Sequence, residues 1–183
     1  MTEEPIDDAT DAEHIARVER AIRAGLLIPA RPTGWPRKAL NAYIQRRVRR
    51  SFHAVRCQGL QRVRQSLAEQ PGGTLFLGNH SCWWDVFLAH FLNEAVPVEG
   101  YGLMEHFNLK RFGFFQRIGC YSVDRSNPAS VRAALSYTTL LLRRPRAAIW
   151  LFPQGRILGN EVRPIRFQPG LRSLVKMAGR ARL

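Results

Sequence analysis

The sequence predicts an α/β protein with a central, mostly parallel sheet and helices on both faces of that sheet. Two observations lead to this fold class: short apolar runs of strand type recur along the chain, and a stretch with helical periodicity follows each of the early ones. Such alternation is typical of parallel sheets, because parallel neighbours need a crossover connection between them. A length of 183 residues is that of one domain, and 45% hydrophobic residues are enough to bury a core.

Amphipathic helices are expected to precede the sheet. Residues 12–29 have the spacing of a short amphipathic helix that Pro29 ends, after a polar and acidic tail. A linker at residues 30–36 leads to a long arginine-rich helix, expected to run from Pro36 to Glu69 with a weak point at Gly59. We therefore expect a tail and short helix at residues 1–35 and the α/β domain at residues 36–183.

The elements of the α/β domain can be assigned in order. Strands are expected at residues 74–78, 97–104, 120–125 and 147–153. Helices are expected at residues 83–93, 106–118, 127–144 and 169–179, the third with Asn127 as its cap and Pro128 at its first position. A further strand would be expected after the last helix and none follows, so we expect a C-terminally truncated form.

The charge of the chain is high and uneven. The net charge is +14 and the sequence pI is about 11.2. Seven of the 14 acidic residues lie in residues 1–20, so the rest of the chain carries 26 basic and seven acidic residues, a net charge of +19. Such a surface attracts anionic lipid, nucleic acid or phosphate-bearing substrates, and charge alone does not choose among them.

Several classes of site and of protein are not indicated. The three cysteines, Cys57, Cys82 and Cys120, are far apart, which is neither a zinc pattern nor a disulfide framework and fits a reducing cytosol. We expect no metal site, and we expect Cys82 to be a buried structural residue. The acidic N-terminus lacks the pattern of a signal peptide, and no run approaches about 18 apolar residues, so any membrane association would be peripheral.

A histidine and an aspartate five residues apart are the candidate catalytic pair. His80 and Asp85 lie where the expected strand 74–78 gives way to the next helix. On one continuous helix they would point about 140° apart, so they can meet only if they straddle a strand end and a first helical turn. There, Asp85 would orient the imidazole and the ring would take a proton from a hydroxyl. The alternative is a structural loop histidine beside a helix N-terminal acid.

Two further strand ends carry polar or turn-forming residues. Arg125 ends the expected strand 120–125, and Pro153, Gly155 and Arg156 lie at or just past the end of strand 147–153. The carboxyl ends of parallel strands meet at one edge, where open α/β sheets bind ligands. Glycine permits close backbone approach and guanidinium groups suit phosphate. We therefore expect one crevice with a base and cationic groups.

Four stretches resemble the glycerolipid acyltransferases of the lysophosphatidic-acid acyltransferase type. The segment NHSCWWD resembles their NHxxxxD block, GCYSVDR their second block, and FPQGR their third, usually FPEGTR. The segment RFQPGLRSLVKMA resembles their Phe-x-x-Gly stretch before a helix. The resemblance covers about residues 70–178, in the order that the family has.

This resemblance implies a glycerol-3-phosphate acyltransferase-like fold and transfer of an acyl group from acyl-CoA or acyl carrier protein to a lipid hydroxyl. The acceptor would be lysophosphatidic acid or another hydroxylated lipid, without a cofactor besides the acyl co-substrate. His80 would be the general base and Asp85 its partner. The acceptor would be bound by Arg125 and by the loop of Phe152, Pro153, Gln154, Gly155 and Arg156. Membership of phospholipid biosynthesis and a peripheral place on the cytoplasmic face of the cell membrane would follow.

The chain also departs from the family pattern. Gln154 stands in place of a glutamate, Arg156 and Ile157 stand in place of Thr-Arg, and a fourth, Pro-containing strand block is absent. A non-catalytic lipid-binding remnant is therefore an alternative. A basic nucleic-acid-binding protein is another, but no zinc finger, helix-turn-helix or RNA-recognition signature accompanies the charge, so no nucleic acid is expected.

Some other residues have more than one interpretation. The arginine-rich helix could bind an anionic membrane or present a solvated back, and both can hold at once. Trp83 and Trp84 could line an acyl path, sit at a membrane interface or pack in the core. His53, His90 and His106 have no metal-ligand spacing and are expected to be structural.

Overall fold

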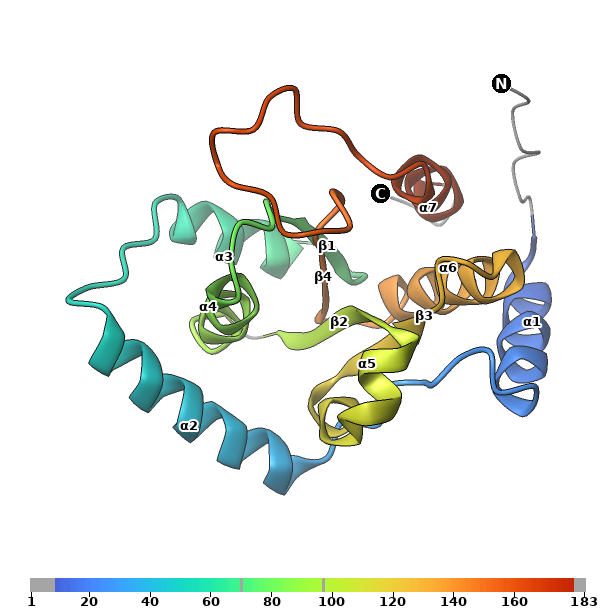
Figure 1. Ribbon diagram of the computed structural model, residues 1–183, viewed down its shortest axis with the longest axis horizontal. Coiled ribbons are helices and arrows are strands. Elements are labelled where there is room, and N and C mark those ends of the chain that lie inside the picture. The colour runs from blue at the N-terminus through green and yellow to red at the C-terminus, as the bar shows by residue number, and fades with distance from the viewer. Residues whose placement is uncertain (1–8, 70, 97, 180–183) are drawn as a thin grey trace.

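The computed structural model describes residues 9–69, 71–96 and 98–179. Within them, four parallel strands form one sheet in the order β1-β4-β2-β3 (Figure 1). The strands are β1 (Thr74–Leu77), β2 (Glu99–Glu105), β3 (Cys120–Val123) and β4 (Ala147–Leu151). The predicted fold class is confirmed, and all four predicted strands are present.

A helix lies between each strand and the next along the chain. After β1 comes α4 (Trp84–Asn93), after β2 come α5 (His106–Arg111) and the 3₁₀ helix η1 (Gly113–Ile118), and after β3 comes α6 (Pro128–Leu142). A long loop follows β4 and leads into α7 (Gly170–Gly179). Asn127 caps α6, since its Oδ1 accepts from the Ala129 N–H at 2.9 Å, with Pro128 at the first turn as predicted.

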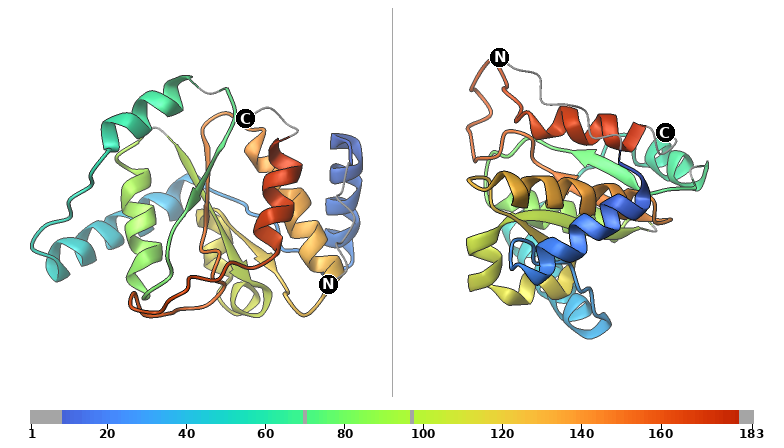
Figure 2. Two further views of the ribbon diagram at one scale, coloured as in Figure 1. Left: turned by 90° about the horizontal axis from the view of Figure 1, so that it is seen from above. Right: turned by 90° about the vertical axis from the view of Figure 1, so that its right-hand side faces the viewer.

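Helices cover both faces of the sheet. Side chains alternate along each strand, so each strand contributes to the core on both sides. In β4, Ala147 and Ile149 join the core cluster that includes Leu141 of α6. Ala148 points the other way, into a cluster with Val63 of α3 (Leu60–Glu69). Figure 2 shows the sheet edge-on, with α3 and α4 on one side and α6, α7 and α1 on the other.

The first helix, α1 (Asp11–Arg23), packs against α6 and ends earlier than predicted. It starts at a capping box between Thr10 and Glu13. Gly25, at φ 69°, ends it in the left-handed conformation, with the Leu26 N–H donating to the Ala21 carbonyl, so a glycine cap and not Pro29 stops the helix. The predicted division of the chain after residue 35 stays a prediction.

The single helix predicted between Pro36 and Glu69 is wrong. Two helices, α2 (Gly34–Ser51) and α3, are separated by a non-helical stretch at residues 52–59. Phe52 leaves the helix in an extended conformation and packs edge-on against Trp84, with ring centroids 4.8 Å apart. This contact between distant parts of the chain breaks the helical pattern before Gly59, which has a φ of 83°.

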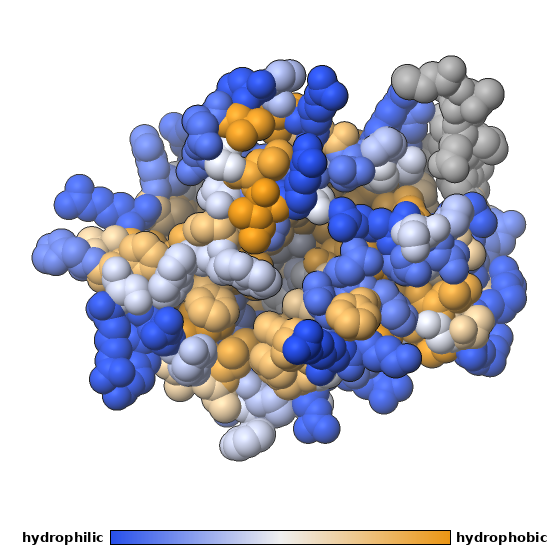
Figure 3. All heavy atoms as spheres, viewed as in Figure 1, coloured by the Kyte–Doolittle hydropathy of each residue, from blue (hydrophilic) through white to orange (hydrophobic). Residues whose placement is uncertain are grey.

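The carboxyl edge of the sheet faces the viewer in Figure 1. In the same view, Figure 3 shows the surface hollowed near its centre, over the sheet, with hydrophobic surface on either side of the hollow and hydrophilic side chains projecting around it. Within the described ranges, no helix is both long enough and apolar enough to span a membrane.

Candidate functional site

The carboxyl ends of the four strands bring the site residues to one edge of the sheet. His80 follows β1, Gln154 follows β4, Glu105 ends β2 and Arg125 follows β3. Because all four strands run parallel, these ends lie side by side in the order β1-β4-β2-β3. Four strand ends, where three were predicted, therefore converge at this edge.

His80 and Asp85 are in direct contact. The Nδ1 of His80 lies 3.0 Å from the Oδ2 of Asp85, and the two side chains are 19% and 15% exposed. Asp85 sits in the first turn of α4, so the pair straddles a strand end and a helix start as the spacing requires. The His80 ring also stacks on Phe152, with centroids 4.5 Å apart and planes 24° apart, which fixes the orientation of the imidazole.

The turn before α4 holds the Asp85 carboxylate. Its Oδ2 accepts hydrogen bonds from the backbone N–H groups of Ser81 at 2.6 Å and Cys82 at 2.9 Å. Partial burial raises the pKa of Asp85, but the hydrogen bonds from Cys82, His80 and Ser81 outweigh it, so the pKa is lowered from 3.8. The carboxylate is therefore ionised at neutral pH and can only accept from the imidazole.

An ionised Asp85 determines which nitrogen of His80 carries the proton. Since the carboxylate accepts, the Nδ1 of neutral His80 donates, and its Nε2 holds the free lone pair. Nε2 makes no hydrogen bond with any residue in the described part of the chain. Chemically, the pair is an oriented imidazole base whose positive charge, once it takes a proton, is stabilised by the carboxylate.

Gln154 ties the loop after β4 to the loop after β1. Its side chain is 6% exposed, and its Oε1 accepts from the His80 backbone N–H at 2.6 Å. In return, the His80 carbonyl accepts from the Leu158 N–H at 2.8 Å. The backbone of His80 is thus held from both sides by the loop that carries Gln154.

Arg125 reaches across the sheet edge to the same loop. Its Nη1 donates to the Gly155 carbonyl at 2.7 Å, and its Nε donates to the Oε2 of Glu105 at 2.9 Å. Gly155 has a φ of 69°, and a Cβ there would lie 3.2 Å from the Arg125 Nη1. This position needs glycine both for its conformation and for the close approach of the guanidinium.

Gln168 lies in the stretch that leads into α7 and is hydrogen-bonded to the loop after β4. Its backbone N–H donates to the Pro153 carbonyl at 2.8 Å, and its Nε2 donates to the Gln154 carbonyl at 3.3 Å. The segment that resembles Phe-x-x-Gly in sequence is therefore hydrogen-bonded to the segment that resembles FPEG.

The predicted site residues are mostly brought together. A connected set of contacts links His80, Asp85, Arg125, Phe152, Pro153, Gln154 and Gly155. Arg156 is exposed and makes no hydrogen bond or ion pair with a described residue. The assignment of the predicted site residues to catalysis and to substrate binding stays a prediction.

Two contributors, Glu105 and Gln168, were missed from the sequence. Glu105 could have been found as a carboxylate at the end of a predicted strand, the same position that marked Arg125. Cys82 was predicted to be buried, which is wrong: it is exposed, in the turn just before α4. Trp83, beside it, is 80% exposed.

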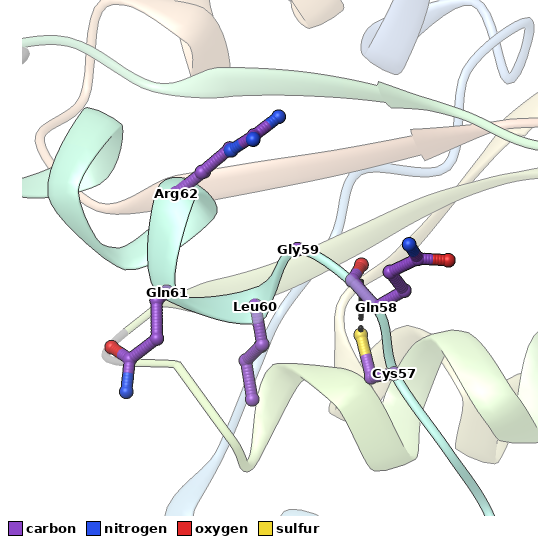
Figure 4. Close-up of a pocket in the computed structure, with 6 residues that line it drawn as sticks. All are labelled: Cys57, Gln58, Gly59, Leu60, Gln61 and Arg62. Carbon is purple, nitrogen blue, oxygen red and sulfur yellow. Dashed lines mark hydrogen bonds between the residues drawn. The ribbon is translucent and has the colours of Figure 1, made fainter.

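The described residues also form a pocket away from the sheet edge. A pocket of about 380 Å³ lies at the amino end of α3, lined by residues 57–62 (Figure 4). In Figure 4 the side chains of Leu60 and Gln61 point away from that of Arg62, so no set of polar groups meets there. Among the residues that the structure describes, no three His, Cys, Asp or Glu side chains are grouped to hold a metal ion.

The sequence is similar to a known protein family. Residues 54–181 match the family model described as acyltransferase. That span contains all four strands and every residue of the hydrogen-bonded site. No curated protein and no solved structure matches the chain.

Proposed function

The chain belongs to the acyltransferase family, and from this premise we propose that it moves a fatty acyl group from a thioester to a hydroxyl of a lipid acceptor, with His80 as general base. The observation that carries this proposal is the hydrogen bond of 3.0 Å between His80 and an ionised Asp85 at the carboxyl edge of the sheet. Acyl transfer follows from the family, whereas the residue roles and substrates are our proposal.

The proposed reaction needs no nucleophile from the protein. The Nε2 of His80 takes the proton of the acceptor hydroxyl while the hydroxyl oxygen forms a bond to the thioester carbonyl carbon. The tetrahedral intermediate then expels the thiolate, which takes the proton back from His80, leaving an ester and a free thiol. Asp85 stabilises the imidazolium between the two steps.

We propose acyl-CoA or acyl carrier protein as the donor, because both present a thioester. The proposed acceptor-binding groups lie on the two loops next to His80 and are Arg125, Phe152, Pro153, Gln154, Gly155 and Arg156. Lysophosphatidic acid is one candidate acceptor and another hydroxylated lipid is the other. A place in phospholipid synthesis depends on which of these two is used.

We also propose that the protein binds an anionic membrane surface through α2. Trp35, at 78% exposed, shares the outer face of α2 with Tyr43, Arg46 and Arg50, because successive members of this set are eight, three and four positions apart. The opposite face carries Ile44 and Val48, each 2% exposed, against the body of the protein. Aromatic and arginine side chains on one exposed face are typical of interfacial helices.

The direct test is the substitution His80→Ala. Acyl transfer from acyl-CoA to a lyso-lipid or monoacylglycerol should fall by about 10³-fold or more, since the base is removed. The circular dichroism spectrum and the melting temperature should stay close to those of the parent protein. His53→Ala, in the exposed segment between α2 and α3, is the matched control and should keep full activity. Activity retained in His80→Ala would remove the base assignment.

A further inference from the structure

Glu105 is a charged group at the sheet edge that the proposed chemistry does not use. It is the last residue of β2, which lies between β4 and β3 in the sheet. Its carboxylate therefore stands between the loop after β4 and Arg125, and its Oε2 accepts from the Arg125 Nε at 2.9 Å. The two side chains are 33% and 56% exposed, so an acceptor in the crevice can reach both.

The pairing changes what Arg125 offers to a ligand. A guanidinium has five N–H donors and a charge of +1. The Nε donates to Glu105 and the Nη1 donates to the Gly155 carbonyl. The Nη2 makes no hydrogen bond within the described residues. What remains are three N–H donors, two of them on Nη2, beside a carboxylate acceptor, and the charge of the guanidinium is matched by that of Glu105.

Headgroups respond differently to such a pair. A phosphomonoester carries nearly two negative charges at neutral pH, and on Arg125 it would lie close to the Glu105 carboxylate. An uncharged hydroxyl both donates and accepts, so it can bond to the carboxylate and the N–H together. Gln154 adds no charge, whereas Arg156, exposed on the same loop, favours anions; Glu105 opposes that preference.

We propose that Glu105 is a specificity-determining residue, which makes the acceptor subsite favour a lipid with an uncharged, hydroxylated headgroup over a phosphomonoester. This inference rests on the proposed acyl transfer for its meaning in catalysis, but the charge effect of Glu105 on ligand binding can be measured without turnover.

The catalytic test compares two acceptors with the same acyl chain, 1-acylglycerol and 1-acylglycerol 3-phosphate, in neutral micelles. The parent protein should have the higher kcat/KM for 1-acylglycerol. Glu105→Gln keeps an acceptor for Arg125 and removes the charge, so it should shift the kcat/KM ratio toward the phosphate by about fivefold. Glu99→Gln removes the same charge at the other end of β2 and should leave the ratio unchanged. A parent preference for the phosphate, or a Glu105→Gln ratio equal to that of Glu99→Gln, would overturn the proposal.

A binding experiment separates this inference from the proposed function. Calorimetry with glycerol 3-phosphate alone should give about fivefold tighter binding to Glu105→Gln than to the parent protein. The double variant Glu105→Gln, Arg125→Gln should not show this gain in affinity for glycerol 3-phosphate over the parent protein. If neither lipid is acylated, the proposed reaction fails, yet this comparison still decides the role of Glu105: equal affinities of parent and Glu105→Gln contradict it.

Discussion

At the residue scale, one carboxylate oxygen organises the start of α4. The Oδ2 of Asp85 accepts from two backbone N–H groups and from the His80 ring, so the same atom closes the turn and orients the imidazole. Each of these hydrogen bonds is strongest when the carboxylate is ionised. Stability and base orientation therefore depend on a single charge.

This dependence predicts how acid affects the protein. The pKa of Asp85 is lowered in the folded state, so its contribution to stability is fully present above the ordinary value of 3.8 and is lost as the pH falls through the folded-state pKa. Asp85→Asn should lower the free energy of unfolding by about 2 kcal/mol at neutral pH.

Denaturant titrations of both proteins from about pH 7 down to about pH 2 test this. The difference between parent and Asp85→Asn should shrink as the pH drops below 3.8. A difference that stays constant over the whole series would mean that the charge of Asp85 contributes nothing.

At the element scale, the loop after β4 is the hub of the site, since it is bonded to the loops after β1 and β3 and to the segment before α7. Gly155 is the point where these contacts are tightest. A Cβ there would stand 3.1 Å from the Gln168 Cγ and 3.2 Å from the Arg125 Nη1, at a φ of 69°.

Gly155→Ala should therefore cost about 1 to 2 kcal/mol, because a left-handed conformation is strained for alanine. It should also weaken acceptor binding, seen as a raised KM, because Arg125 has to move. Gly113→Ala is the matched control, since nothing lies within 4 Å of its Cβ position and its φ is not in the left-handed range. Equal melting temperatures and equal KM values for the two variants would show that the loop after β4 accommodates a Cβ at position 155 without loss of stability or of acceptor binding.

At the scale of the whole molecule, the charge is unevenly distributed along the chain. The acidic residues of positions 1–20 leave a net charge of +19 on the rest, and α2 exposes several of its arginines beside Trp35. A basic surface with exposed aromatic side chains should bind anionic vesicles, with an affinity that falls as salt is added.

The double variant Arg46→Gln, Arg50→Gln should lose about 2 kcal/mol of vesicle-binding free energy, at about 1 kcal/mol per arginine. Arg20→Gln, Arg23→Gln on α1 removes the same charge elsewhere and should lose less. Sedimentation with vesicles containing phosphatidylglycerol measures both. Equal losses would place the membrane contact elsewhere, and tight RNA binding without vesicle binding would favour the nucleic-acid alternative.

The sequence predicts strand positions and the approach of His80 to Asp85 because both depend on local spacing and on the rule that parallel strand ends meet. It does not predict the break after Ser51, which depends on Phe52 meeting Trp84 from another part of the chain. Nor does it predict that Glu105 pairs with Arg125, because that contact depends on β2 and β3 being neighbours in the sheet, which local spacing does not determine.

The most direct test of the catalytic proposal is a double-mutant cycle on His80 and Asp85, with the rate of acyl transfer as readout. Asp85→Asn alone should lower the rate by about 10³-fold, because the imidazole loses its orienting acceptor. Added to His80→Ala, the same substitution should have no further effect, since residues that act as one unit are not additive. Equal effects of Asp85→Asn with and without His80 would show that the two do not act together.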